Sequence, residues 1–123
     1  MKHLTLTALA IAGLITTSFA QQKVNDKAVI KTPEASCDLC KARIENYVSH
    51  QYGIISVVVD TKKRTTTVTW ITDRTNIEEV KTDIANAGFD ADDVTAEETA
   101  YLKLPRECKK TGQQTVAADS LKH

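Results

Sequence analysis

Two β-branched runs separated by four residues constrain the fold of this 123-residue chain most strongly. They are residues 54–60 (IISVVVD) and residues 65–71 (TTTVTWI). β-Branched side chains favour extended backbone, and the polar segment between the runs, residues 61–64, suits a short connection. The sequence therefore predicts two antiparallel strands that are neighbours in one sheet.

Helical patterns flank this hairpin on both sides. Residues 37–51 repeat apolar side chains at helical spacing, and residues 77–87 do the same. The second helix has a sharper start, because the segment from Thr75 to Glu78 fits a capping box. Gly53 and Gly88 follow the two helices, where a glycine suits a left-handed stop.

Two further strands complete the pattern. Residues 28–32 form a short β-branched run that is ended by Pro33, and residues 89–94 form a weaker, edge-like run that contains three aspartates. The order over residues 27–94 is then strand, helix, strand, strand, helix, strand. This order predicts an α+β, ferredoxin-like βαββαβ fold, with two helices on one face of a four-stranded antiparallel sheet.

A short helical extension is expected after this unit. The segment from Thr95 to Glu98 fits a second capping box, so residues 95–104 are predicted to form a helix that ends before Pro105. Tyr101 and Leu104 share one face of this helix and can pack back on the domain. The remaining tail is polar, without periodicity, and is expected to fray.

The first twenty residues have the pattern of a secretory signal peptide. A short polar start precedes an apolar core over residues 4–15, and small residues Ser18 and Ala20 precede the expected cleavage point. An apolar core of about 12 residues is too short to span a bilayer, which needs about 20. We therefore expect cleavage after Ala20 and export, to the periplasm if the cell is Gram-negative. The predicted organisation is a signal peptide (1–20), a linker (21–26), one domain (27–94), and an extension with a tail (95–123).

Composition excludes one broad class of partner. Sixteen basic and sixteen acidic residues balance to a formal charge of zero, and only 5% of residues are aromatic. Nucleic-acid binding needs a clustered basic surface, often with aromatic stacking platforms. We expect no nucleic-acid partner.

The main chemical feature is a Cys-x-x-Cys motif formed by Cys37 and Cys40 at a helix start. The first cysteine lies in the loop and the second in the opening turn, so both sulfurs can converge on one point. The positive end of the helix dipole favours negative charge there. Two convergent thiolates select soft cations, with Cu(I) first and Hg(II), Ag(I), Cd(II) and Zn(II) as alternatives.

Around this motif the sequence resembles the heavy-metal-associated domain family, whose members include copper chaperones and periplasmic mercury-binding proteins. The resemblance covers roughly residues 27–94 and implies a ferredoxin-like fold that binds a soft metal through Cys37 and Cys40 without catalysis. It implies that Phe89 covers the sulfurs, although an ordinary core role is equally open for this aromatic residue. The matching positions are Cys37, Cys40, Ile44, Gly53, Val57, Asp60, Val68, Trp70, Gly88 and Phe89.

One departure from the family pattern lies beside the motif. Glu34 and Ala35 stand where the family carries Gly-Met, so the methionine that fills the core beneath the metal loop is missing. The effect of Ala35 on the loop is left open by the sequence. A looser metal loop is one consequence to test.

The third cysteine, Cys108, follows the predicted extension helix. Its functional interpretation is a third thiolate that folds back on the metal site, and its alternatives are an exposed tail thiol or a bridge to another molecule. An exported chain can also join Cys37 and Cys40 in a structural disulfide, which would make it an interaction module. A thiol–disulfide redox protein is a further alternative.

The sequence thus favours an exported metal-binding protein, a metallochaperone or scavenger, rather than an enzyme. It would hold one Cu(I) or Hg(II) ion, with Zn(II) as an alternative, and pass it on by thiolate exchange. The expected partner is a metal-transporting membrane protein or another thiol metal carrier. A monomer is expected, with a metal-bridged dimer as the alternative.

Overall fold

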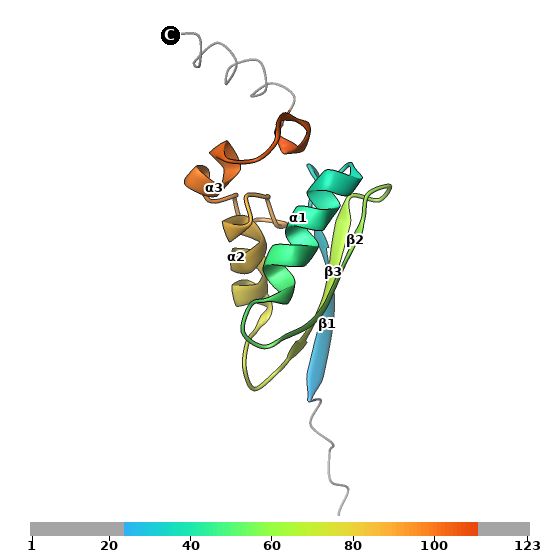
Figure 1. Ribbon diagram of the computed structural model, residues 1–123. Coiled ribbons are helices and arrows are strands. Elements are labelled where there is room, and N and C mark those ends of the chain that lie inside the picture. Colours follow the sequence, from blue (N-terminus) through green and yellow to red (C-terminus); the bar gives the residue numbers. More distant parts are fainter. Residues whose placement is uncertain (1–23, 111–123) are drawn as a thin grey trace, which may run out of the picture.

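A computed structural model describes residues 24–110 of the chain (Figure 1). The predicted signal peptide and most of the predicted fraying tail lie outside these residues. The elements in chain order are β1 (Asn25–Lys31), α1 (Asp38–Ser49), β2 (Ile54–Asp60), β3 (Thr65–Ile71), α2 (Ile77–Asn86), α3 (Glu98–Leu102) and the 3₁₀ turn η1 (Arg106–Cys108).

The three strands form an antiparallel sheet in the order β1-β3-β2. The predicted hairpin is confirmed, with both strands at the predicted residues. Its turn is closed by Asp60, whose carboxylate accepts hydrogen bonds from the backbone N–H groups of Lys62 and Lys63, each at 3.0 Å. These bonds, first that from Lys63, hold the pKa of Asp60 below its usual range.

The prediction of a fourth strand is wrong: the sheet within the described residues 24–110 has three strands. Residues 89–94 form a turn with a single isolated bridge between Ala91 and Val94. Asp92 has a left-handed backbone (φ 52°), which reverses the chain. Its backbone N–H donates to the Lys31 carbonyl at 2.9 Å, and its carboxylate accepts from the Lys31 backbone N–H at 2.7 Å. The segment therefore meets only the end of β1 and does not pair along it.

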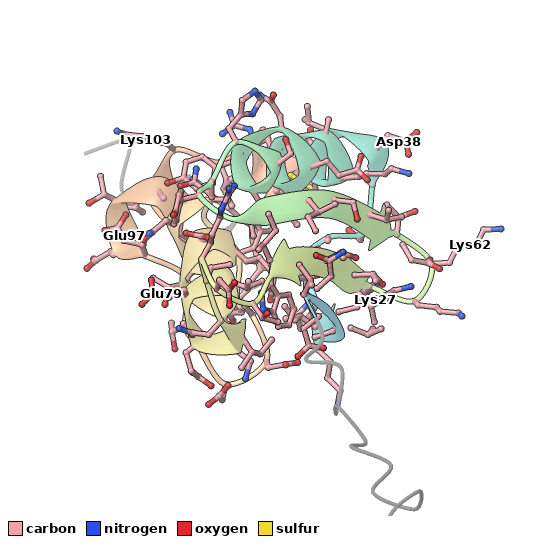
Figure 2. All side chains as sticks on the ribbon, turned by 90° about the horizontal axis from the view of Figure 1, so that it is seen from below. Lys27, Asp38, Lys62, Glu79, Glu97 and Lys103 are labelled. Carbon is pink, nitrogen blue, oxygen red and sulfur yellow. A yellow bond between two sulfur atoms is a disulfide. The ribbon has the colours of Figure 1, made fainter. Side chains whose placement is uncertain are left out.

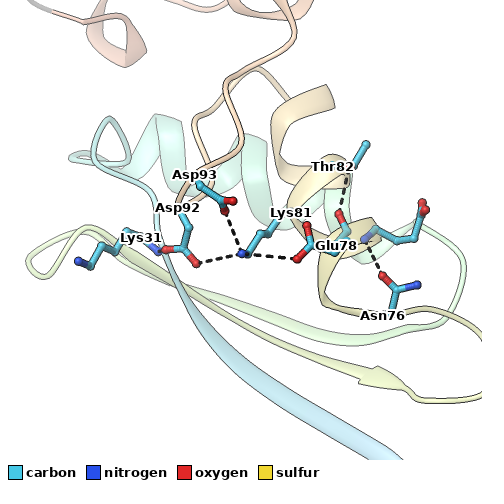
Figure 3. A network of polar contacts seen from close by, with 8 residues as sticks. Lys31, Asn76, Glu78, Lys81, Thr82, Asp92 and Asp93 are labelled. Carbon is cyan, nitrogen blue, oxygen red and sulfur yellow. Dashed lines mark hydrogen bonds and ion pairs between the residues drawn. The ribbon is translucent and has the colours of Figure 1, made fainter.

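Lys81 ties this acidic turn to α2 (Figure 3). Its ammonium group lies 3.0 Å from the Asp93 carboxylate, 3.8 Å from that of Asp92 and 3.9 Å from that of Glu78. The hydrogen bond to Asp93 is the main reason that the pKa of Lys81 is raised. The turn is thus held by these ion pairs together with the Asp92–Lys31 bonds, and not by a strand ladder.

Both predicted helices are present, with small shifts at their ends. α1 falls within the predicted residues 37–51. α2 begins one residue later than the capping box suggested, because Asn76 is the N-cap and accepts from the Glu79 backbone N–H at 3.0 Å. Gly53 and Gly88 have φ values of +82° and +106°, as expected of glycines that end helices.

α1 and α2 cover one face of the sheet, and the core lies between the two layers (Figure 1). Figure 2 shows the same layers from below, with labelled charged side chains such as Lys62 and Glu79 pointing outward. None of the helices described over residues 24–110 has the length and hydrophobicity that a bilayer-spanning segment needs. The buried apolar core comprises Ile30, Ala35, Cys40, Ile44, Val48, Val59, Val68, Trp70, Val80, Ile84, Ala85, Phe89, Ala91, Leu104 and Cys108.

The C-terminal extension packs back on this core. α3 starts later than predicted, because Glu97 and not Thr95 is the N-cap; its carboxylate accepts from the backbone N–H groups of Thr99 and Ala100. Leu104 is only 4% exposed, which confirms the predicted contact face. A Cβ at Gly88 would lie 3.0 Å from the Leu104 side chain, so the extension sits closely against the end of α2.

Candidate metal centre

The Cys-x-x-Cys motif lies where the sequence placed it, at the start of α1. Cys37 is the N-cap residue, with extended backbone (φ −142°, ψ 168°), and its carbonyl accepts the first helical bond from Lys41 at 3.0 Å. Cys40 lies in the first turn and is fully buried, whereas Cys37 is partly exposed. The two sulfur atoms are 3.1 Å apart. The spacing therefore brings both thiols to one point, as predicted.

The extension brings Cys108 to the same point. Pro105 begins the turn η1, in which the Cys108 backbone N–H donates to the Pro105 carbonyl at 2.9 Å, and η1 packs against α1. Cys108 is 0% exposed, and its sulfur, with those of Cys37 and Cys40, forms a group whose members all lie within 4.8 Å of one another. The alternative of an exposed tail thiol is wrong. The site holds three cysteines, not two.

The bonding of these sulfurs differs from the disulfide that the sequence suggested. Cys40 is bonded to Cys108, and Cys37 is a free thiol. The Cα atoms of the bridged pair are 5.6 Å apart, which is in the usual range for a disulfide. The predicted alternative of a Cys37–Cys40 bridge is therefore not the bond present. In this state Cys40 cannot offer a thiolate to a metal.

A carboxylate clasp holds the extension in place. One oxygen of Asp90 accepts from the Ala96 backbone N–H at 2.8 Å, and the other contacts the Lys110 ammonium group at 2.8 Å. Burial alone would raise the pKa of Asp90, but the Lys110 and Ala96 hydrogen bonds hold it below its usual range. The Lys110 backbone N–H also donates to the Tyr101 hydroxyl at 2.9 Å. The clasp thus joins both ends of the segment that carries Cys108.

Glu34, one of the two residues that depart from the family pattern, faces this clasp. Burial raises the pKa of its carboxyl group, and repulsion from Asp90 raises it further, while Lys110 opposes both effects. The neighbouring Ala35 is fully buried and belongs to the same core cluster as Leu104 and Cys108. The metal loop therefore shares its core with the extension.

Two further side chains, Phe89 and Asp38, bear on the description of the site. Phe89 is 1% exposed and belongs to the buried cluster that contains Cys40 and Cys108, which fits both the cover and the core interpretation. Asp38 is exposed in the first turn of α1 and points outward (Figure 2). It is not a member of the three-cysteine group found among residues 24–110.

Sequence reasoning missed the clasp between Asp90 and Lys110. Asp90 belongs to a charged run whose pattern predicts a weak strand, and Lys110 belongs to a run whose pattern predicts a tail. The opposite charges of these two runs were the available signal, but charge alone does not say which pair meets.

Comparison with known proteins identifies the family. The sequence model of the heavy-metal-associated domain matches residues 29–90, which is half of the chain. The chain belongs to the heavy-metal-associated domain family. The matched residues contain Cys37 and Cys40, whereas Cys108 lies beyond them. The comparison with curated proteins finds no match.

Solved structures of similar fold include MerP and a metallochaperone. Oxidised MerP from Ralstonia metallidurans CH34 is 21% identical, with a TM-score of 0.52, and the match covers 55% of this chain and 93% of MerP. The CopZ metallochaperone is 20% identical, with a TM-score of 0.51, and the match covers 54% of this chain and 98% of CopZ. At these identities the likeness concerns the fold, which is that of a heavy-metal-associated domain.

Proposed function

We propose that the reduced chain binds one thiophilic metal ion with Cys37 and Cys40 and acts as a metallochaperone or scavenger. Membership of the heavy-metal-associated domain family supports this role. The observation that carries the proposal is the convergence of the cysteine sulfurs at the N-terminus of α1. Anionic ligands are stabilised there by about 0.3–1 kcal/mol at exposed sites.

The donor set favours soft cations. Thiolate ligands select Cu(I) and, by the same softness, Hg(II), while Zn(II) is a further candidate because it also accepts tetrahedral sulfur ligation. Cys108 would act as a third thiolate once its bond to Cys40 is reduced. Phe89 would shield the sulfurs from water. These ligands bind the metal without any catalytic step.

Transfer would proceed by ligand exchange. A thiolate of the recipient would enter the coordination sphere as Cys37 leaves, because Cys37 is the partly exposed member of the group. The recipient would be a metal-transporting membrane protein or another thiol metal carrier, and the chain would act as a monomer. Residues 1–20 support export, to the periplasm in a Gram-negative cell.

The test is metal binding by the reduced protein. Cu(I), Hg(II) and Zn(II) would be titrated separately into the reduced chain and into Cys37→Ser and Cys40→Ser variants. We expect one ion per chain and a large loss of affinity in each variant. Equal stoichiometry and affinity in the variants and the parent would refute the assignment of ligands.

A second candidate function is thiol–disulfide exchange with other proteins. The observation that favours it is a free thiol, Cys37, 3.1 Å from a sulfur of the Cys40–Cys108 disulfide. A redox protein would catalyse the reduction of insulin by dithiothreitol in a manner dependent on Cys37. A rate equal to that of the Cys37→Ser variant would exclude this activity.

A further inference from the structure

The three sulfurs of the site differ in access and in bond state. Cys40 and Cys108 are both 0% exposed and are bonded to each other, whereas Cys37 is partly exposed and free. A reductant in solution therefore has no direct path to either sulfur of the disulfide. The sulfur of Cys37, a partly exposed residue, lies 3.1 Å from the Cys40 sulfur.

We propose that the C-terminal extension is a redox latch on the metal site, and that Cys37 is the thiol that opens it. In the closed state Cys40 is bonded to Cys108, so Cys37 and Cys40 cannot both be thiolates and cannot bind a metal together. In the open state Cys37 and Cys40 are both reduced. The link to metal binding rests on the proposed function, whereas the exchange chemistry stands without it.

The opening begins with an exchange inside the chain. The Cys37 thiolate attacks the Cys40 sulfur, a Cys37–Cys40 bond forms, the Cys40–Cys108 bond breaks, and Cys108 leaves as a thiolate. One thiolate is consumed and one is released, so no net electrons are transferred. The disulfide has moved from two buried residues to a pair that includes the partly exposed residue Cys37.

A dithiol reductant, small-molecule or protein, completes the reaction. Its first thiolate attacks the Cys37 sulfur and forms a mixed disulfide, and Cys40 leaves as a thiolate. Its second thiol then displaces Cys37, so the reductant leaves as a disulfide after giving two electrons. The two protons of the dithiol balance the new thiols. The product has Cys37, Cys40 and Cys108 all reduced.

The extension is built to keep Cys108 within reach of Cys40 after the bond opens. Leu104, 4% exposed, anchors the extension in the core four residues before Cys108, and the Asp90–Lys110 contact holds the chain two residues after it. Cys108 therefore remains at a high local concentration beside the site. The latch closes again when a disulfide oxidant accepts the two electrons and the two thiol protons and leaves as a dithiol.

The experiment measures the rate of disulfide reduction in the folded, metal-free protein. The oxidised parent chain and the Cys37→Ser variant would be mixed with dithiothreitol in native buffer, quenched with acid, alkylated and analysed by mass spectrometry of peptides. We expect reduction to slow by about tenfold or more in the variant, because the relay through Cys37 is lost. We also expect Cys108 to be alkylated first in the parent chain, while Cys37 and Cys40 are bridged.

Two controls keep the result interpretable. The Cys37→Ala variant repeats the test without a hydroxyl, and intact mass before the reaction verifies that the Cys40–Cys108 bond is present in each protein. In 8 M urea, where burial is lost, about equal reduction rates are expected for all three proteins. Equal rates in native buffer would overturn the latch. Failure of metal binding with a normal exchange would instead refute the proposed function alone.

Discussion

The Cys40–Cys108 bond should account for a large part of the stability of the oxidised domain. The bridge joins residues 68 positions apart. In the chain-entropy model, closing a loop of this length removes enough freedom from the unfolded state to stabilise the fold by roughly 4 kcal/mol. Domains of this size have total stabilities of about 5–15 kcal/mol, so this effect is easily measured.

The matched pair for this test is Cys37→Ser and the double variant Cys37→Ser/Cys108→Ala. Neither protein can form a Cys37–Cys40 bridge, so they differ only at Cys108. In urea titrations without reductant, we expect the free energy of unfolding to be about 2–4 kcal/mol lower in the double variant. After reduction, the difference should fall to about 1 kcal/mol or less, the cost of a small deletion in the core.

Two results would refute this reasoning. The first is a difference below about 1 kcal/mol in the oxidised pair, which would mean that the bond adds no net stability. The second is a difference that persists at full size after reduction, because packing of the Cys108 side chain and not the covalent bond would then be its cause.

Three further predictions concern other parts of the molecule. Burial and then repulsion from Glu79 raise the pKa of Asp83 to about 6. The folded state therefore favours the protonated carboxyl group. This contribution to the free energy of unfolding is present below about pH 4 and is lost as the pH rises through 6. Asp83→Asn should therefore raise the free energy of unfolding at pH 7.5 by up to about 1 kcal/mol, allowing for solvent screening, with no gain in urea titrations at pH 4. Lys110→Ala removes the contact with Asp90 and should speed alkylation of Cys108 in the reduced protein severalfold. Urea titrations should show a change in the free energy of unfolding below about 1 kcal/mol. An unchanged alkylation rate would contradict the clasp. Gly88→Ala should lower the free energy of unfolding by roughly 1–3 kcal/mol, because φ is +106° and the new Cβ lies 3.0 Å from Leu104; wild-type stability in urea would contradict this close packing.

Local sequence patterns predicted the elements that local forces determine. The strands at residues 54–60 and 65–71 were predicted in full because β-branched runs and a short polar turn act within the hairpin itself. The start of α2 was misplaced by one residue because Thr75 and Asn76 are both good capping residues, and the choice depends on which one reaches the third N–H.

Elements that depend on distant partners were not predictable in the same way. The fourth strand was expected from residues 89–94, but Asp92 uses its carboxylate and backbone to hold the end of β1, and Lys81 from α2 fixes the turn. These bonds join segments far apart in the sequence. No local pattern contains them.

The same distinction between local and distant interactions applies to the candidate site. The convergence of Cys37 and Cys40 follows from a three-residue spacing at a helix start, which the sequence shows directly. The position of Cys108 depends on how Leu104 packs and how Lys110 meets Asp90. From the sequence, a position of Cys108 beside the other two cysteines could therefore be only one of several alternatives.

The most direct test of the central claim is Cu(I) binding by one preparation before and after reduction. Cu(I) would be supplied from a coloured chelator that competes for the metal, with a Cys37→Ser/Cys40→Ser double variant as the control. We predict that the reduced chain takes one Cu(I) from the chelator, and that the oxidised chain with its Cys40–Cys108 bond takes none at the same chelator concentration. A reduced chain that competes no better than the double variant would contradict the account.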